Sequence, residues 1–259
     1  MRRLAPIFGL ALVIFAIIAP TAASARSLQL ITDGGTLLVC AHPNALPYAS
    51  RYGDVPGLQI EIAEAIAKQL GVTLTRNWVF SSYQFRRAGC DIVLDAIGDK
   101  GALAEVGLRS SRPYYRSGVT LAVRKDSPTS KLSDLSKDTK VGVQVGSIAA
   151  MRFSKAGIGI SPFVFEDEML DALQNKELDA AAVTPGAIGW FNLKHPDAQL
   201  QQVSVFEGDA DLNWNVAVGM IGPDDKLRER IDAALEALLA DGTLSRLYAR
   251  YGMAFRPPE

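Results

Sequence analysis

Apolar and polar residues alternate along this chain in blocks that predict strands followed by helices. Residues 37–41 form a short apolar run, typical of a buried strand, and residues 58–70 repeat apolar positions at helical spacing. Between them lies a loop bracketed by Pro43 and Pro56. In α/β proteins, ligands bind in the loops that follow the carboxyl ends of strands. The pattern therefore makes this loop a candidate binding segment.

The same alternation continues to the end of the chain. Residues 91–97 are apolar through most of the run, as strands of parallel sheets are because both their faces are buried. Residues 224–240 place apolar side chains at helical spacing, and Gly242 follows as a C-terminal cap. The pattern predicts further strands at 74–80, 117–124, 141–145, 178–183, 203–206 and 215–220, and further helices at 148–156, 166–175 and 243–251. The predicted fold class is therefore α/β.

The predicted strands divide the chain into two parts. Two β-rich segments, 117–124 and 213–220, bracket the middle section, and no Pro-, Gly- or Ser-rich linker separates independent domains. We expect these segments to act as hinge crossings between two lobes, each a mostly parallel sheet flanked by helices. The first lobe is expected to comprise residues 26–116 together with 221–259, and the second lobe residues 125–212.

The first 25 residues have the pattern of an export signal. Arg2 and Arg3 precede an apolar run over residues 7–19, and Ala23-Ser24-Ala25 supplies a small-x-small cleavage pattern. The apolar run is shorter than the roughly 20 residues that a membrane-spanning helix needs. We therefore expect cleavage before Arg26 and a periplasmic protein whose mature chain is not embedded in the membrane.

The charge of the mature chain argues against nucleic acid as a partner. Without Arg2 and Arg3, 25 of the 27 basic residues remain against 28 acidic residues, which gives a net charge of −3. No long charge run or basic stripe occurs, and nucleic-acid-binding domains usually carry one.

Two cysteines, Cys40 and Cys90, would lie in an oxidising compartment, which favours a disulfide. The expected geometry raises a second possibility. Cys40 lies late in one predicted strand and Cys90 just before another, so parallel pairing of these strands could separate the two Cα atoms by roughly 10 Å. The alternative to a disulfide is a pair of buried free thiols.

Metal, cofactor and nucleophile chemistry find little support in the sequence. His42 and His195 are far apart, and the two cysteines lack the spacing of a metal site. No phosphate-binding loop or nucleophile-elbow motif occurs. The acidic run 166–168 is interpreted as the start of a helix, where negative charge complements the helix dipole. We therefore predict no metal, no cofactor and no catalytic residue.

Several short motifs, in their order along the chain, resemble one family. They are Leu46-Pro47-Tyr48, the segment 57–63 that leads the first helix, Ala88 to Val93, Arg112 to Gly118, and Val141 to Ser147. Together they resemble the type II periplasmic solute-binding proteins of family 3, typified by polar amino acid receptors. The resemblance implies a two-lobe fold, usually monomeric, that closes over a small ligand and delivers it to the permease of an ABC transporter.

The chain departs from amino acid receptors where they grip the charged ends of the ligand. The family's carboxylate-binding Arg falls at Leu103 or Ala104, and its ammonium-binding Asp falls at Thr184. A small hydroxyl residue becomes Gly98, and an acidic residue at the end of the first strand becomes His42. Unpaired ligand charges in a closed cleft would cost several kcal/mol. We therefore expect a ligand other than a free α-amino acid.

The remaining cleft positions are mostly aromatic or apolar. Trp78 matches the position where the family stacks an aromatic ring on its ligand. Asp95, inside an apolar strand, either recognises a cation or hydroxyl of the ligand or caps backbone groups. The candidate ligand-binding residues are His42, Asn44, Tyr48, Trp78, Asp95, Gly98, Tyr115, Gly146, Ser147, Thr184 and Trp214.

Two alternative functions remain. Solute-binding-like proteins encoded beside quinoprotein methanol dehydrogenases are similar at segments 43–48, 90–93 and 112–117, although the segment between Trp78 and Cys90 is shorter here. That similarity implies an accessory protein of a periplasmic PQQ-dependent dehydrogenase, which would then be the partner. A few relatives of the fold are cyclohexadienyl dehydratases, but no acid–base pair stands out in this sequence.

Overall fold

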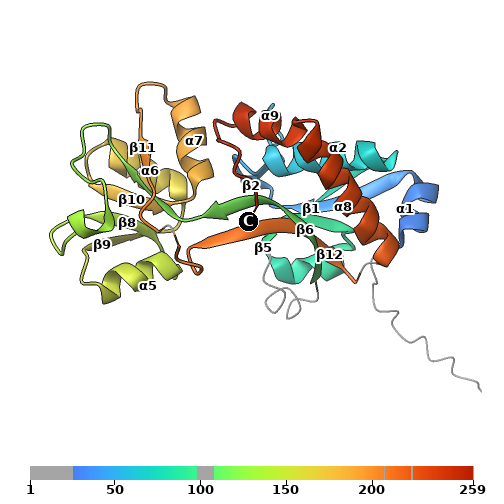
Figure 1. Ribbon diagram of the computed structural model, residues 1–259, viewed down its shortest axis with the longest axis horizontal. Helices are drawn as coiled ribbons and strands as arrows, with labels where there is room; N and C mark the ends of the chain where they lie inside the picture. Colours follow the sequence, from blue (N-terminus) through green and yellow to red (C-terminus); the bar gives the residue numbers. More distant parts are fainter. Residues whose placement is uncertain (1–25, 98–107, 207, 223, 259) are drawn as a thin grey trace, which may run out of the picture.

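The computed structural model describes residues 26–97, 108–206, 208–222 and 224–258, and these residues build two five-stranded sheets (Figure 1). We call the part of the chain around each sheet the first and the second lobe. The first sheet has the order β4 (Thr73–Trp78), β1 (Thr36–Ala41), β5 (Ile92–Ile97), β12 (Asn213–Ile221), β6 (Leu108–Gly118). The second has the order β11 (Gln201–Val203), β7 (Thr120–Val123), β10 (Ala180–Val183), β8 (Val141–Gln144), β9 (Ile160–Phe163). The predicted two-lobe α/β fold is confirmed.

Helices cover both sheets. The first lobe carries α1 (Leu28–Gly34), α2 (Leu58–Leu70), α3 (Phe85–Ala88), α8 (Asp225–Ala240) and α9 (Thr243–Arg250). The second lobe carries α5 (Ile148–Lys155), α6 (Glu166–Gln174) and α7 (Pro185–Lys194). Two short 3₁₀ turns (Ser82–Gln84 and Leu132–Asp134) and a small hairpin of β2 (Asn44–Ala45) and β3 (Ala49–Ser50) complete the described elements.

Each sheet is parallel on one side and antiparallel on the other. Strand β1 runs parallel to β4 and β5, and β8 runs parallel to β9 and β10. Strand β12 runs antiparallel to β5 and β6, as β7 does to β10 and β11. The carboxyl ends of β1 and β5 therefore lie at one edge of the first sheet, and those of β8 and β10 at one edge of the second. Ligand sites form at such edges.

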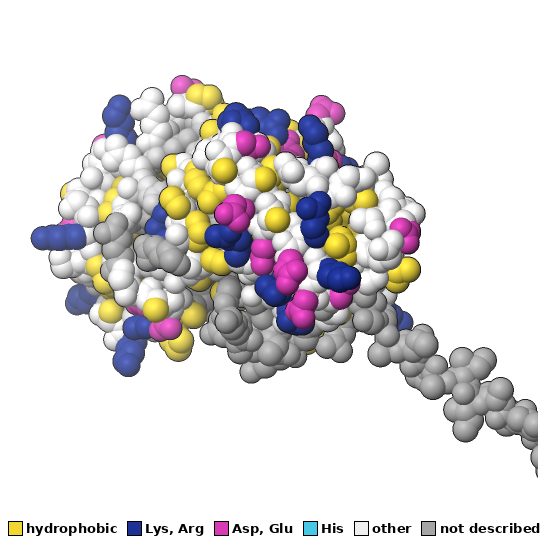
Figure 2. All heavy atoms as spheres, turned by 45° about the vertical axis from the view of Figure 1, so that its right-hand side comes forward, with side chains coloured by type: hydrophobic (Ala, Val, Ile, Leu, Met, Phe, Trp, Pro, Cys, Tyr) yellow, Lys and Arg dark blue, Asp and Glu magenta, His cyan; other side chains and the backbone are white. Residues whose placement is uncertain are grey.

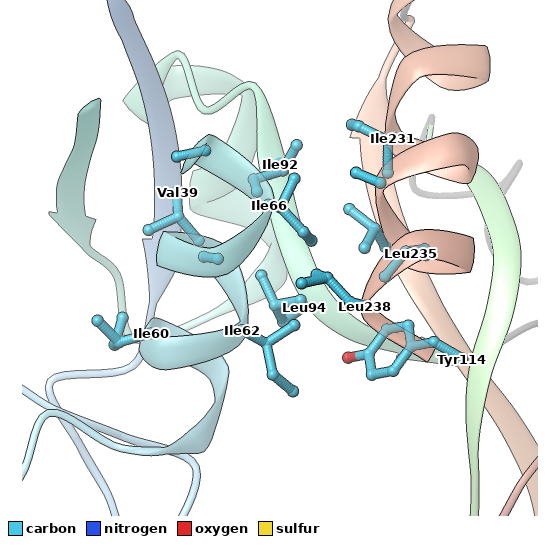
Figure 3. Close-up of a cluster of buried hydrophobic side chains, with 14 of the residues drawn as sticks. Val39, Ile60, Ile62, Ile66, Ile92, Leu94, Tyr114, Ile231, Leu235 and Leu238 are labelled. Atoms are coloured by element: carbon cyan, nitrogen blue, oxygen red, sulfur yellow. The ribbon is translucent and has the colours of Figure 1, made fainter. Parts of the chain in front are cut away.

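The core of the first lobe lies between its sheet and helices α2 and α8 (Figure 3). Helix α2 buries Ile60, Ile62 and Ile66 because these residues recur at helical spacing, and α8 contributes Ile231 and Leu235 in the same way. Burying one such side chain stabilises the fold by roughly 1.5–3 kcal/mol. The second lobe has separate clusters around Phe153 and Met169, among others. Each lobe thus has its own packed support.

The chain passes from the first sheet to the second at Val119, between β6 and β7, and it returns to the first sheet between β11 and β12. Strand β12 lies in the first sheet along its whole length, paired with β5 and β6. The segments predicted as hinge crossings, 117–124 and 213–220, thus consist largely of strands paired within one sheet. The chain changes sheet next to these strands. The predicted hinge motion and lobe boundaries stay predictions.

Cys40 and Cys90 form a disulfide, with their Cα atoms 5.6 Å apart. Extending the register of the two strands back to Cys90 predicted a Cα separation of roughly 10 Å, and this prediction is wrong. Cys90 precedes β5, which begins at Ile92, so the register of β1 and β5 does not fix its position. Gly89 has a φ of 66°, a conformation that favours glycine, and it turns the chain before Cys90. The disulfide therefore joins the end of β1 to the turn before β5.

Helix α7 of the second lobe packs closely on the first lobe. A Cβ added at Gly186 would lie 2.5 Å from Tyr48 Oη, and one added at Gly189 would lie 2.2 Å from the carbonyl oxygen of Gly252. Any larger residue would push the two lobes apart at these points. The sequence did not predict this helix, because Pro185 and the two glycines are poor helix formers. Pro185 follows the N-cap Thr184, where proline is tolerated.

Acidic and basic side chains lie interspersed on the face of the molecule drawn in Figure 2. Ion pairs on the surface include Arg109–Asp225 and Arg112–Glu236, whose side chains are at least half exposed. Exposed pairs of this kind contribute roughly 0–1 kcal/mol each. Within the described ranges, no helix is long and apolar enough to cross a membrane.

Candidate functional site

A cavity of about 630 Å³ lies between the two lobes. The first lobe contributes Ile97 at the end of β5, and Trp214 and Asn215 at the start of β12. The second lobe contributes most of the wall, from the ends of β8 and β10 and the first turns of α5 and α6. The described lining residues are Ile97, Val119, Gln144, Ser147, Ile148, Ala149, Glu166, Ala182, Val183, Thr184, Ala210, Asp211, Leu212, Trp214 and Asn215.

The polar part of the second-lobe wall is built at two strand-to-helix junctions. After β8, Gly146 adopts a φ of 72°, and Ser147 then caps α5 by accepting a hydrogen bond from the backbone N–H of Ala150 at 3.1 Å. After β10, Thr184 caps α7 by accepting from the N–H of Ala187 at 3.3 Å. Hydroxyl residues favour this position because they satisfy orphan N–H groups of the first turn. The folding of both helices thus fixes the two hydroxyls at the cavity.

Glu166, the first residue of α6, lines the same wall. Its carboxylate accepts hydrogen bonds from the backbone N–H of Thr184 at 2.6 Å and from Thr184 Oγ1 at 2.9 Å. Burial raises the pKa of the Glu166 carboxyl above its ordinary value, and the bonds from Thr184 oppose this rise. Among described residues, no Lys, Arg or His forms an ion pair with Glu166.

A hydrogen bond between the lobes ends at the same threonine. Tyr48, in the loop after β1, donates from its hydroxyl to Thr184 Oγ1 at 3.1 Å. Burial strongly raises the pKa of the Tyr48 hydroxyl, and the nearby charge of Glu166 adds to the rise, so Tyr48 stays a neutral donor. Tyr48, Thr184 and Glu166 form a hydrogen-bonded chain from the first lobe to the second. We call it the interlobe chain.

Asp95 has a structural setting different from that of Glu166. Its carboxylate accepts from Tyr114 Oη at 2.5 Å and from Gln59 Nε2 at 2.8 Å, while its own N–H donates to Tyr114 Oη at 3.0 Å. It has a φ of 55°, a strained value for a residue with a side chain. Burial raises the pKa of the Asp95 carboxyl. Asp95 is outside the described lining of the cavity, and both donors to its carboxylate are first-lobe side chains, so the geometry favours a structural role, although the partners are side chains and not the backbone groups of the sequence interpretation.

The other predicted ligand-binding residues divide into two groups. Ser147, Thr184 and Trp214 line the cavity. Tyr48 is not in the described lining, but its hydroxyl donates a hydrogen bond to the lining residue Thr184. The described lining does not include His42, Asn44, Trp78, Asp95, Tyr115 or Gly146, and Gly98 lies outside the described residues, as do Leu103 and Ala104.

Their contacts explain why several of these residues lie elsewhere. Trp78 packs against the first-lobe core, and Tyr115 stacks on Tyr248 with ring centroids 4.1 Å apart. Burial raises the pKa of Tyr115 to about 12. His42 Nδ1 accepts a hydrogen bond from the N–H of Asn44 at 3.1 Å, so this pair orders the loop.

Sequence reasoning missed four polar or charged features of the cavity: Gln144, Glu166, Asp211 and Asn215. Gln144 ends β8 and is the last residue but one of the predicted strand 141–145, so its position near a strand end could have drawn attention to it. Glu166 was interpreted only as a residue that complements the helix dipole. No local pattern shows that α6 begins beside Thr184, because that proximity comes from tertiary packing.

The described lining carries acidic but no basic side chains. Asp211 is paired with Arg152, whose Nη2 lies 2.5 Å from Asp211 Oδ2. Glu166 is the other acidic residue in the described lining. When the Glu166 carboxyl is ionised, it makes the electrostatic potential in the cavity negative. In the described part of the chain, no cluster of three side chains could hold a metal ion.

Comparisons with known proteins agree with this architecture. Residues 37–254 match the bacterial extracellular solute-binding proteins, family 3. The probable amino-acid-binding protein YxeM of Bacillus subtilis (strain 168) is 25% identical over 230 residues, which cover 85% of this chain and 84% of that protein.

Two solved structures share the fold. An ancestral cationic amino acid solute-binding protein (AncCDT-1) has a TM-score of 0.75 at 21% identity, covering 87% of this chain and 99% of that chain. An amino acid ABC transporter substrate-binding protein from Streptococcus pneumoniae Canada MDR_19A, bound to L-arginine, has a TM-score of 0.67 at 21% identity. The match covers 88% of this chain and 98% of that chain. With the match over residues 37–254, these observations establish that the chain belongs to the bacterial extracellular solute-binding proteins, family 3.

Proposed function

We propose that this protein captures a small solute in the cavity between its lobes and delivers it to an ABC-type transporter in the periplasm. One observation carries the proposal: side chains from both lobes line one cavity of about 630 Å³. A volume in the range of about 300–1,000 Å³ suits a small molecule. YxeM and the two solved structures bear the names of binding proteins, which favours binding over catalysis.

The same proposal includes export. The predicted signal peptide, residues 1–25, lies outside the described residues, and Arg26 begins them. Arg26 pairs with the fully buried Asp91, with Nη2 2.5 Å from Oδ2. This bond gives the first residue of the predicted mature chain a place in the fold. The Cys40–Cys90 disulfide suits an oxidising compartment.

We further propose that the solute is not a free α-amino acid. Thr184 occupies the position at which the family resemblance places an acidic residue for the ammonium group, and the resemblance places the Arg for the carboxylate at Leu103 or Ala104. The described cavity wall offers no basic side chain in its place. A buried and unpaired carboxylate on the ligand would oppose binding.

A thermal-shift screen with pools of amines, polyols, sugars and amino acids tests the binding function. Ligand that binds only the folded state raises the melting temperature. We expect at least one pool without amino acids to raise it. If no pool does so, and a quinoprotein dehydrogenase copurifies with the chain instead, the transport proposal fails in favour of the accessory role.

Two tryptophan variants then locate the site of any identified ligand. Trp214 lines the cavity, whereas Trp78 packs against the first-lobe core. We expect Trp214→Phe to weaken binding of that ligand and Trp78→Phe to leave it near the wild-type value, as measured by isothermal titration calorimetry. The reverse result would place the ligand away from the cavity.

A further inference from the structure

Glu166 is an acidic group at the cavity wall, and among the described residues it forms no ion pair with a basic side chain. Its two oxygens accept hydrogen bonds from the N–H and hydroxyl of Thr184, which are neutral donors. Within the described residues, the other lining carboxylate, Asp211, already has Arg152 as its partner. A partly buried carboxylate is most stable when a cation compensates it. Glu166 therefore has a capacity for a positive charge that the described protein groups do not fill.

The hydrogen bonds of Glu166 leave room for such a contact. An ionised carboxylate offers about four acceptor sites on its two oxygens, and Thr184 uses two of them. The interlobe chain also fixes the orientation of this carboxylate, because Tyr48 donates to the same Thr184 hydroxyl that donates to Glu166. A ligand cation would thus meet an acceptor already held in position, which lowers the entropic cost of binding.

The rest of the wall suits the carbon part of an organic cation. Ile97, Val119, Ile148 and Leu212 supply apolar surface, and Trp214 supplies an aromatic ring. Aromatic faces attract cations as well as hydrocarbon. The described wall has no Lys, Arg or His to bind an anion, and Lys100 is the single basic residue in the sequence between 98 and 107.

We infer that the cavity takes a small organic amine or guanidine without a carboxylate, whose charged group lies against Glu166. This inference rests on the proposed solute-binding function and names the chemical class of the solute. Glu166 is then a residue that determines ligand specificity, and Thr184 is the residue that positions it.

Calorimetry with matched probes tests the inference. Cadaverine carries two amines, L-lysine adds a carboxylate to the same skeleton, and 1,5-pentanediol replaces the amines by neutral hydroxyls. We expect cadaverine, or its guanidine counterpart agmatine, to bind the wild-type chain at least about tenfold more tightly than L-lysine and the diol, a difference of about 1.4 kcal/mol. This comparison needs no variant and therefore does not depend on the folding of one.

Glu166→Gln removes the charge while keeping the shape of the side chain. We expect it to weaken binding of the amine by at least about tenfold. Glu168→Gln is the matched control, because Glu168 carries the same side chain two residues further along α6 but is exposed and lies outside the described lining. It should leave the affinity near the wild-type value. Circular dichroism confirms that each variant is folded.

The results separate this inference from the proposed function. If neither cadaverine nor agmatine binds, or if Glu166→Gln binds them as the wild type does, the assignment of Glu166 is overturned. If the assignment of Glu166 is overturned in this way but a neutral solute from the screen binds, the proposed binding function still stands. If no solute in the screen or the panel binds at all, both proposals fail together.

Discussion

The two strand edges that face each other across the cavity each hold a buried carboxylate, and they use it in different ways. At the end of β5, Asp95 accepts from Tyr114 and Gln59, all within the first lobe. At the start of α6, Glu166 accepts from Thr184 and lines the cavity. The chemistry of the two groups is similar, but one is enclosed by its own lobe and the other faces the space between lobes. Position relative to the cavity, more than residue type, separates a structural acid from a ligand-binding one.

The first-lobe edge is also more strongly cross-linked. The Cys40–Cys90 disulfide ties β1 to the turn before β5, and Asp91, in that same turn, is held by Arg26 and by the N–H of Leu38 at 2.7 Å. The second-lobe edge is held by hydrogen bonds, which include the helix caps, the interlobe chain and a bond from Gln144 Nε2 to the carbonyl oxygen of Val164 at 3.3 Å. We therefore interpret the first lobe as the rigid wall and the second as the carrier of polar recognition.

The largest effect on stability should come from removing the disulfide. Replacing Cys40 and Cys90 together by Ala opens a loop with a sequence separation of 50 residues. On the chain-entropy account this lowers the free energy of unfolding by about 4 kcal/mol. Urea unfolding measures the change, and thiol titration of the denatured, unreduced wild type should find no free thiol. Two free thiols in that titration would show that the Cys40–Cys90 disulfide is absent.

The next effect should come from Tyr114→Phe. The change removes the donor to Asp95 Oδ1 and the acceptor of the Asp95 N–H, so it leaves buried polar groups without a partner. We expect the free energy of unfolding to fall by about 2 kcal/mol. A double-mutant cycle with Asp95→Ala, which removes the side-chain acceptor, isolates the pair. Additive effects of the two changes would mean that the bond contributes nothing to stability.

Tyr48→Phe is the matched deletion of a hydroxyl on the other side of the comparison. It breaks the bond to Thr184 but leaves Thr184 its bonds to Glu166 and Ala187. We expect a smaller loss of stability, about 1 kcal/mol, together with weaker binding of the solute because the carboxylate is held less firmly. Calorimetry and urea unfolding measure the two effects. Equal losses of stability for Tyr48→Phe and Tyr114→Phe would remove the distinction between the two edges.

The smallest effect should be on the pH dependence of stability. Because burial raises the folded-state pKa of Asp95 above its ordinary value of 3.8, the folded state holds this proton more tightly than the unfolded state. The stability from this group is present below pH 3.8 and is lost as the pH rises through the raised folded-state pKa. The difference in unfolding free energy between wild type and Asp95→Asn should therefore shift in this acidic window. A difference that stays constant across it would show that the pKa of Asp95 is unchanged by folding.

The sequence predicted the long, regular elements well. Helix α2 has the predicted bounds, Leu58–Leu70, because a full set of apolar residues at helical spacing specifies it. Helix α7 was missed, since its glycines oppose helix formation locally and serve instead the close approach of Tyr48 and Gly252. Tertiary contact decides such an element, and local propensity does not.

The candidate site likewise combines residues that the sequence identified with residues that only tertiary packing brings to the cavity. Ser147 and Thr184 became candidates through the family resemblance, and the structure adds that each follows a strand and caps a helix. Asp95 was placed among the site candidates as an acidic residue inside an apolar strand, but Tyr114, whose hydroxyl donates to its carboxylate, comes from another strand. Glu166 joins the cavity only because α6 packs beside β10, and nothing in its local sequence shows this.

Carbon-13 NMR of the carboxyl groups tests the central distinction most directly. The pKa of Glu166 and of Asp95 would be followed with and without saturating cadaverine. Because a nearby cation favours the charged form, our account predicts that cadaverine lowers the pKa of Glu166 and leaves the pKa of Asp95 unchanged. A pKa of Glu166 that does not move, or a shift at Asp95 in its place, would contradict the account.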